Sequence, residues 1–271
     1  MRRDARRATL GAVDSRALAS VSLPTWDVVF VDATGSTNAD AAATPVPGRV
    51  VVTDHQTAGR GRLDRGWETP AGVALTFSAV IDPELPAAHW PWLPLLAGVA
   101  VADAVRRATA LVPSLKWPND VLVGDRKLAG ILVERVAGPA GPVAVVGVGV
   151  NVHQTELPVP HATSLALEGA TLDRADLLQA VLAGIAGELA GWRSSGGDPS
   201  GLRASYRAQC GTLGCDVRVE LPGGGAVEGR AEDVDDQGRL VVREAGGGTR
   251  ALSAGDVVHV RVPPRPARRP E

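Results

Sequence analysis

The chain has 271 residues, of which 45% are hydrophobic and 21% charged, and its formal net charge is −2. This length fits one large domain or a catalytic domain with a small appendage, and the near-neutral charge excludes a general nucleic-acid binder or a polybasic membrane protein. The chain has only two cysteines, Cys210 and Cys215, so neither a disulfide framework nor a four-ligand zinc site is expected. The sequence predicts neither a secretory leader nor a membrane span, and the expected location is the cytoplasm.

The first two thirds of the chain predict alternating strands and helices. The helix after the first strand can be capped by Ser36, Thr37 or Asn38, and Asp173 is a suitable N-cap for the last one. Residues 115–123 and 126–134 are both interpreted as strands, and Gly124-Asp125 predicts a hairpin turn between them. The expected strands are at 28–31, 50–53, 73–81 (half-buried) and 142–152, together with the two strands of the hairpin. The expected helices include one at about 94–111 and one at 174–192.

The chain changes character from about residue 213. Four or five short alternating segments follow one another, separated by turns rich in glycine and aspartate. Such a pattern predicts a small β-barrel. The last residues, PPRPARRPE, predict a disordered basic tail.

Residues 55–68, HQTAGRGRLDRGWE, combine glycines, arginines and a tryptophan. Closely spaced glycines let the backbone approach a ligand, and arginine pairs with carboxylate or phosphate. A mobile basic surface loop is the alternative, and composition alone leaves the two interpretations equally open. Asp64 and Glu68 offset two of the positive charges, which weakens a nucleic-acid interpretation.

Four further motifs are each ambiguous by themselves. In KWPNDVLV, Asp120 could act as a base or hold a metal, or it could belong to an ordinary turn after Pro118. In KLAGILVE, Gly130 suggests close approach by a ligand or only tight packing. GVGVN places Asn151 at a strand end, where ligands often bind or where a turn begins, and GSTN could contact a polar ligand or merely cap a helix. Lys116 and Lys127 are the only lysines in an arginine-rich chain, which suggests that these positions require an ammonium group.

Together, the blocks GSTN, TDHQTAGRGRLDRGW, LKWPNDVLV, KLAGILVE and GVGVNV resemble the signature blocks of biotin–protein ligases in order and spacing. The resemblance runs from about Asp27 to Leu167 and, more loosely, through the C-terminal segment. It implies an α/β (α+β) fold, in which a mixed-sheet, class II synthetase-like catalytic domain is followed by a small SH3-like β-barrel. The expected division is an N-terminal extension at 1–25, a biotin- and ATP-binding catalytic domain at 26–212, an SH3-like domain at 213–262 and a disordered tail at 263–271.

The resemblance also implies an activity. The family forms biotinyl-5′-AMP and pyrophosphate from biotin and ATP with Mg²⁺, and then transfers biotin to one lysine of a biotin carboxyl carrier domain. The expected partners are the carrier domains of biotin-dependent carboxylases, with no DNA and no membrane, and the chain is expected to be a monomer or a weak homodimer. Because GSTN begins at residue 35, too little chain precedes it for a winged-helix domain, and no repressor activity is expected.

Motif by motif, the resemblance assigns site residues to this sequence. Lys127 and Arg62 are expected to neutralise charge when a carboxylate attacks the α-phosphate, and Asp120 is expected to assist the carrier lysine. The biotin-binding set is Ser36, Thr37, Asn38, Gln56, Arg60, Gly61, Arg62, Lys127, Gly130, Gly147 and Gly149. The ATP- and adenylate-binding set is Arg60, Arg62, Arg65, Trp67, Lys116, Asn119, Lys127 and Asn151, with Trp67 toward adenine and Mg²⁺ held through the ATP phosphates.

Two positions depart from the family pattern, and two other functions remain open. Gly35 stands where the family often has serine, and Asp64 stands where many members have glycine or a neutral residue. The first alternative is a lipoate- or octanoate-transferring ligase on a related fold. The second is a nucleic-acid- or protein-binding role for the C-terminal segment, which carries no aromatic residues on its strands for base stacking.

Overall fold

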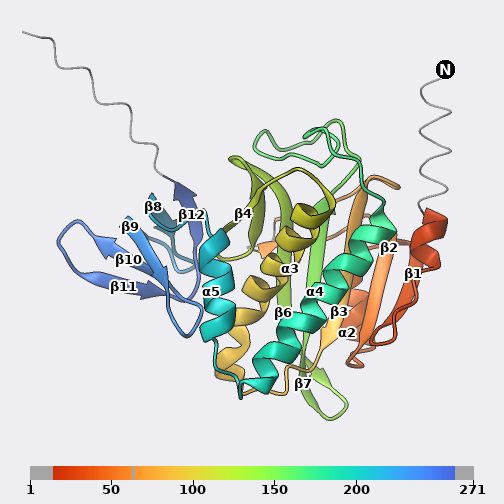
Figure 1. Ribbon diagram of the computed structural model, residues 1–271, viewed down its shortest axis with the longest axis horizontal. Helices are drawn as coiled ribbons and strands as arrows, with labels where there is room; N and C mark the ends of the chain where they lie inside the picture. Colours follow the sequence, from red (N-terminus) through yellow and green to blue (C-terminus); the bar gives the residue numbers. More distant parts are fainter. Residues whose placement is uncertain (1–14, 63–64, 260–271) are drawn as a thin grey trace, which may run out of the picture.

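The computed structural model describes residues 15–62 and 65–259, which form two sheets (Figure 1). The larger sheet has seven strands in the order β1-β2-β3-β7-β6-β5-β4, and the smaller has five in the order β11-β10-β9-β8-β12. The larger sheet consists of β1 (Asp27–Thr34), β2 (Arg49–Gln56), β3 (Ala74–Ile81), β4 (Pro113–Lys116), β5 (Asp120–Val123), β6 (Arg126–Gly138) and β7 (Gly141–Asn151). The smaller consists of β8 (Asp216–Glu220), β9 (Ala226–Val234), β10 (Leu240–Glu244), β11 (Thr249–Leu252) and β12 (Asp256–His259).

The larger sheet is mixed, as predicted. Strands β1 and β2 run parallel, and the other neighbouring pairs run antiparallel. The parallel pair requires a crossover, which α2 supplies. The helical elements are α2 (Thr37–Ala43), the 3₁₀ helix η2 (Ala87–Trp92), α3 (Leu93–Ala108), α4 (Arg174–Ser194) and α5 (Ser200–Gln209).

The two faces of the larger sheet are covered differently. Helices α3 and α4 lie side by side across one face (Figure 1), where Val146, Val148 and Val150 of β7 join the main core. On the other face Val145 packs with Ala41 of α2 in a small second cluster. Because α2 is only seven residues long, it covers part of this face, and the next β7 positions on that side are glycines. A short helix and small residues therefore leave space beside the sheet.

Most predicted elements are confirmed, with small shifts at their ends. Ser36 caps α2, because its Oγ accepts a hydrogen bond from Ala39 N at 3.4 Å. Asp173 caps α4 by accepting from two backbone amides of the first turn. The Gly124-Asp125 turn joins β5 to β6. The mixed α/β fold, followed by a separate five-stranded β-sheet, is therefore as expected.

Two predictions about individual strands were wrong. Residues 115–123 do not form one strand: the chain reverses through a turn that contains the cis Trp117–Pro118 bond, so that Lys116 pairs with Asp120. The proline has no amide hydrogen for a strand ladder and falls in this turn. Strand β3 is buried along its whole length, not half-buried, because α2 packs on part of its second face, where Val80 joins the small cluster and Ser78 Oγ bonds to Thr37 Oγ1. The sequence reasoning also missed η2 and α5.

The smaller sheet is anchored to the larger unit through the turn between β9 and β10. Trp92 Nε1 donates to Asp236 O at 2.9 Å, and Trp117 Nε1 donates to Gly238 O at 3.0 Å. Arg203 of α5 adds ion pairs with Asp233 and Asp236, each at 2.6 Å. These contacts fix the position of the smaller sheet, including its last strand, β12.

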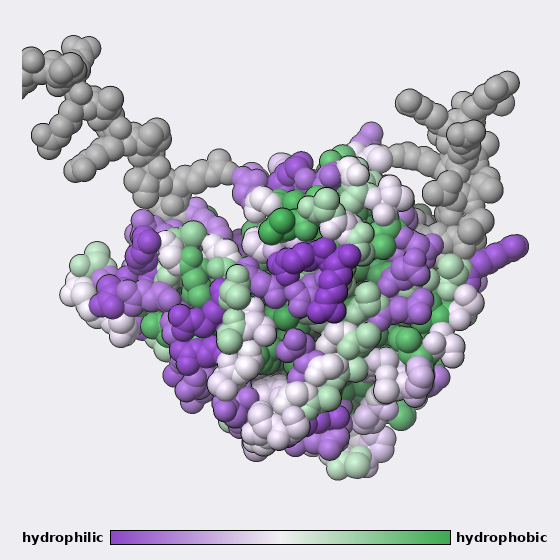
Figure 2. Space-filling model, viewed as in Figure 1, coloured by the Kyte–Doolittle hydropathy of each residue, from purple (hydrophilic) through white to green (hydrophobic). Residues whose placement is uncertain are grey.

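On the face seen in Figure 2, hydrophilic and hydrophobic residues are interspersed. Within 15–62 and 65–259, no helix combines the length and apolar character that crossing a membrane requires. The predictions that concern the first fourteen residues, Asp64 and the C-terminal tail lie outside the described residues.

Candidate functional site

A pocket of about 1260 Å³ opens on the face of the larger sheet that α2 leaves uncovered. Residues from segments far apart in the sequence meet there, and every residue predicted for the site lines it. The predicted residues on its wall are Ser36, Thr37, Asn38, Gln56, Arg60, Gly61, Arg62, Arg65, Trp67, Lys116, Asn119, Asp120, Lys127, Gly130, Gly147, Gly149 and Asn151.

One end of the pocket is a buried hydrogen-bond network at the start of α2. Gln56 Oε1 accepts from Thr37 N at 3.0 Å, and Gln56 Nε2 donates to Trp67 O at 3.1 Å. Ser78 Oγ lies 2.8 Å from Thr37 Oγ1 and 2.5 Å from Asn38 Oδ1. Because these polar groups are buried and mutually bonded, they are held in fixed directions and can recognise a polar ligand group.

The floor of the pocket is made of glycines on β6 and β7. A Cβ at Gly147 would lie 2.1 Å from Asn38 Oδ1, and a Cβ at Gly149 would lie 2.4 Å from the indole of Trp67. A Cβ at Gly130 would lie 3.1 Å from Lys127 Nζ. The glycines thus let side chains from α2, the arginine loop and β6 lie directly against the sheet.

Lys127 reaches the pocket because the ladder between β5 and β6 is irregular. Leu122 pairs with Lys127 and Val121 pairs with Ala129, so that Leu128 is skipped. The extra residue reverses the alternation of side chains, and Lys127 therefore shares the pocket face with Gly130. The backbone of Lys127 is also fixed by the segment at 161–163, to which it both donates and accepts hydrogen bonds.

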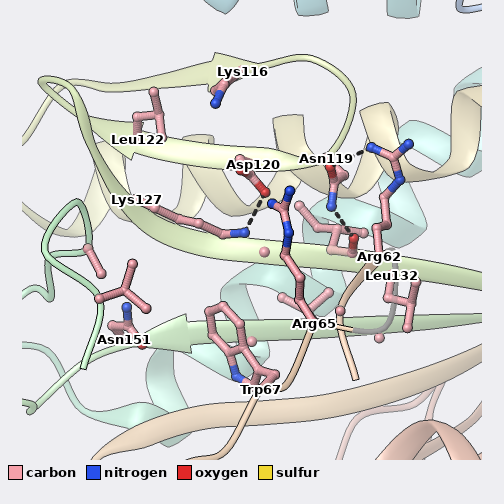
Figure 3. A pocket seen from close by; sticks show the side chains of 18 of the residues that line it. Arg62, Arg65, Trp67, Lys116, Asn119, Asp120, Leu122, Lys127, Leu132 and Asn151 are labelled. Carbon is pink, nitrogen blue, oxygen red and sulfur yellow. Dashed lines mark hydrogen bonds and ion pairs between the residues drawn. The ribbon is translucent and has the colours of Figure 1, made fainter. Parts of the chain in front are cut away.

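Lys127 and Asp120 form an ion pair with 2.7 Å between Nζ and Oδ1 (Figure 3). The ammonium group also lies 5.6 Å from the ring centroid of Trp67. Trp67 Nε1 and Thr76 Oγ1 are buried polar atoms of the pocket that have neither a hydrogen-bond partner nor an ion pair within the described residues. Such atoms are costly to leave unpaired, so they are candidate contacts for a bound ligand.

Three arginines of residues 60–65 enter the pocket from the loop after β2. Arg62 Nη1 donates to Asn119 Oδ1 at 3.2 Å and to Gly255 O at 3.1 Å, and burial lowers the pKa of its guanidinium against the opposing effect of Asp256. Arg65 pairs with Asp256, and this hydrogen bond raises the pKa of Arg65. The loop therefore contacts both the β4–β5 turn, through the Arg62–Asn119 bond drawn in Figure 3, and the smaller sheet, through Asp256.

The two asparagines of the predicted ATP- and adenylate-binding set are hydrogen-bonded to other parts of the protein. Asn119 Nδ2 donates to Ile131 O at 2.8 Å. Asn151 Nδ2 donates to Thr163 O at 2.9 Å, while its Oδ1 accepts from Gln154. These bonds hold the rim of the pocket, and the predicted contact of Asn151 with an adenylate stays a prediction.

Sequence reasoning missed the part of the pocket that comes from β12. Asp256 and His259 both line the wall, although the β12 segment had been interpreted only as a barrel strand. Burial, and then the positive charge of Lys116, lower the pKa of His259 and favour the neutral ring. No local signal marks these residues, because only the docking of the smaller sheet brings them to the site.

The arrangement suits a reaction between anions. Lys127, Arg62, Arg65, Arg60 and Lys116 supply positive charge around one cavity. Such groups can hold a carboxylate close to phosphates and neutralise the charge that develops between them. The pocket also combines a fixed polar end with several cationic side chains, as a site for two substrates would require.

Comparisons with known proteins agree with this geometry. Residues 30–151 match the Biotin/lipoate A/B protein ligase family, and residues 212–260 match the Biotin protein ligase C terminal domain. The chain is 46% identical to a biotin–acetyl-CoA-carboxylase ligase from Mycobacterium tuberculosis over 84% of this chain and 87% of the relative.

Solved structures give the same result. A biotin protein ligase from Aquifex aeolicus in complex with biotin and ATP matches with a TM-score of 0.76 and 27% identity, over 87% of this chain and 99% of that one. A biotin protein ligase from Leishmania major in complex with biotinyl-5-AMP matches with a TM-score of 0.60 and 25% identity, over 86% of this chain and 100% of that one.

Proposed function

The chain belongs to the biotin protein ligase family, and from this premise we propose that it is an ATP-dependent ligase that attaches biotin to a protein lysine. In the first step it joins biotin and ATP into biotinyl-5′-AMP and releases pyrophosphate. In the second, a lysine of a biotin carboxyl carrier domain takes the biotinyl group. The observation that carries the proposal is the single pocket in which a fixed polar end meets the Lys127–Asp120 pair and the arginine loop.

We assign the polar end, Ser36 to Asn38 with Gln56, to the head group of biotin. Its buried donors and acceptors are held by one another, so they are preorganised before a ligand arrives. The carboxylate of biotin would then extend along the glycine floor toward Lys127. Ser36 Oγ accepts the capping hydrogen bond from Ala39 N, and its own O–H remains available to donate to the ligand.

In the activation step, Lys127 and Arg62 reduce the repulsion between the biotin carboxylate and the α-phosphate. Lys127 can leave Asp120 for a ligand oxygen without leaving the pocket, because both line the same wall. Arg60 and Arg65 extend the cationic surface toward the remaining phosphates. The residues contribute position and charge, and no protein nucleophile is required.

Magnesium enters this proposal as part of the MgATP substrate. Within residues 15–62 and 65–259, no group of three or more histidine, cysteine, aspartate and glutamate side chains is placed to hold a metal ion. Phosphate oxygens are the usual main ligands of Mg²⁺ at nucleotide sites. We therefore place the ion on the phosphates and assign no residue as its dedicated ligand.

In the transfer step, we assign the assisting carboxylate to Asp120, which is paired with Lys127 in the pocket. Once Lys127 contacts the ligand, Asp120 can accept a proton from the incoming carrier lysine or orient its amine. The partner is then a folded carrier domain that presents one lysine to the open pocket. The ligase from Mycobacterium tuberculosis, named for acetyl-CoA carboxylase, supports a carboxylase carrier as the acceptor.

The test is to incubate the purified protein with a carrier domain, biotin and MgATP, and to measure the mass of the carrier by mass spectrometry. We expect a gain of one biotinyl group, accompanied by biotin-dependent release of pyrophosphate. A carrier whose acceptor lysine is replaced by arginine serves as the control. Because the matched family also includes lipoate ligases, lipoate is offered in parallel; transfer of lipoate without transfer of biotin would replace the proposal with that alternative.

A further inference from the structure

Glu134 lies beside the pocket at a position for which the sequence predicted no role. It is on β6, two residues beyond Leu132 and four beyond Gly130, both of which line the pocket. Side chains alternate along a strand, so these three residues share one face. The side chain of Glu134 is 35% exposed, so that it lies at the edge between the pocket and the part of the sheet under α2.

One carboxylate here contacts two residues that come from different elements. Glu134 Oε2 accepts a hydrogen bond from Asn38 Nδ2 at 2.6 Å. Glu134 Oε1 lies 3.6 Å from Arg60 Nη2. Asn38 is near the start of α2, and Arg60 is in the arginine loop, so Glu134 links the polar end of the pocket to the cationic loop.

The first contact determines how the Asn38 amide is turned. A carboxylate only accepts hydrogen bonds, so the Asn38 NH₂ group must face Glu134. The Asn38 oxygen then faces the other way, where Ser78 Oγ lies 2.5 Å from it and the absent side chain of Gly147 leaves room for it. The remaining lone pair of this oxygen can accept a hydrogen bond from a ligand N–H.

We propose that Glu134 is a positioning residue for ligand recognition, acting through the Asn38 amide and the Arg60 guanidinium. This inference rests on the proposed function, because the ureido ring of biotin supplies the N–H donor that an oriented Asn38 oxygen recognises. Arg60 stays near the pocket because the same carboxylate attracts it. Glu134 itself need not touch the ligand.

A double-mutant cycle tests this role in the full chain, with biotin binding measured by calorimetry and the KM values for biotin and ATP measured by pyrophosphate release. We expect Glu134→Ala to weaken biotin binding about tenfold and to raise the KM for biotin similarly. The KM for ATP at saturating biotin should rise by a smaller factor than the KM for biotin, because only the longer contact of Glu134, with Arg60 at 3.6 Å, concerns the phosphates. Because Glu134 acts largely through Asn38, adding Glu134→Ala to Asn38→Ala should cost no more than about twofold beyond Asn38→Ala alone.

Conservative and distant variants separate positioning from a general loss of structure. Glu134→Gln keeps an acceptor for Asn38 but loses the charge that attracts Arg60, so it should recover part of the biotin affinity. Glu244→Ala removes an exposed carboxylate on β10 and should leave both KM values unchanged. Thermal unfolding of each variant shows whether the protein is folded, and Glu134→Gln remains informative if an alanine variant is not.

Additive effects of Glu134→Ala and Asn38→Ala would overturn the proposal, as would equal changes in the KM values for biotin and ATP. Unchanged biotin binding by a folded Glu134→Ala protein would overturn it as well. The wild-type protein reports separately on the proposed function. If it shows no biotin binding and no biotin-dependent pyrophosphate release, the proposed function itself is wrong.

Discussion

At the scale of single residues, the position of Lys127 shows how backbone irregularity creates the site. Regular alternation would place Lys127 on the same face as Ala129 and Ile131, which are both in the core. The skipped pairing at Leu128 instead turns Lys127 into the pocket and toward Asp120. The half-buried ammonium group of Lys127 would be costly to leave without a partner, and Asp120 supplies one until a ligand anion arrives.

Replacing Lys127 with alanine should lower the rate of adenylate formation by about 10²–10³, because it removes a cation from the position where negative charge accumulates. Stopped-flow or quench measurement of biotin-dependent pyrophosphate release gives this rate directly. Arg126→Ala is the matched control on the same strand, since Arg126 pairs with Glu168 at 2.7 Å outside the pocket lining. A near-normal rate for Lys127→Ala would contradict the assigned role.

At the scale of elements, β7 combines two functions through its alternation. Its valines at 146, 148 and 150 pack into the main core, while Gly147 and Gly149 form the pocket floor on the opposite face. The glycines are required by contact and not by backbone conformation, because side chains of α2 and the arginine loop lie against them. A strand with this pattern can stabilise the fold and still leave one face open to a ligand.

Gly149→Ala should therefore destabilise the protein by about 1–3 kcal/mol and raise the KM for biotin, since its Cβ would lie 2.4 Å from the Trp67 indole. Thermal unfolding and steady-state kinetics measure the two effects. Gly187→Ala is the matched control, because Gly187 is exposed on α4 and a Cβ there would meet nothing within 4 Å. That control should be neutral or more stable by up to about 1 kcal/mol. Equal effects of the two substitutions would show that the pocket floor tolerates a methyl group.

At the scale of the whole molecule, the smaller sheet completes the pocket. It is held through the β9–β10 turn by the indole groups of Trp92 and Trp117. The same docking brings Asp256 and His259 of β12 to the pocket wall, where Asp256 pairs with Arg65. The attachment of the sheet and the arrangement of the arginine loop are thus physically connected.

Trp117→Phe should lower the free energy of unfolding by about 1–3 kcal/mol, because the carbonyl of Gly238 loses its buried donor. It should also raise the KM for ATP, since the wall formed by β12 is less firmly held. Urea unfolding followed by circular dichroism measures the first effect, and pyrophosphate release the second. Trp26→Phe is the control. The Nε1 atom that it removes is buried but has no hydrogen-bond partner within 15–62 and 65–259, so the free energy of unfolding should fall much less. Similar losses for both variants would argue against the anchoring role of Trp117.

Local sequence determined most elements and the list of candidate site residues. Apolar runs, continuous or alternating, indicated the strands, Ser36 and Asp173 indicated where helices begin, and Gly124-Asp125 indicated a hairpin turn. These signals are local, because capping, turn geometry and alternation depend on neighbours in the chain. The resemblance of the motif blocks then identified residues that lie together in one pocket, although pattern alone gave no distances.

Tertiary structure decided the features that depend on distant partners. Burial of both faces of β3 required the cluster with α2, and the reversal at Pro118 allowed Lys116 to pair with Asp120. The side chain of Lys127 faces the pocket because β6 pairs irregularly with β5. Asp256 reaches the pocket only because the smaller sheet docks against the larger unit. The role proposed for Glu134 likewise depends on Asn38 and Arg60, which only folding brings within reach of its carboxylate. The sequence therefore determined which chemical groups are available, while long-range packing determined which of them meet.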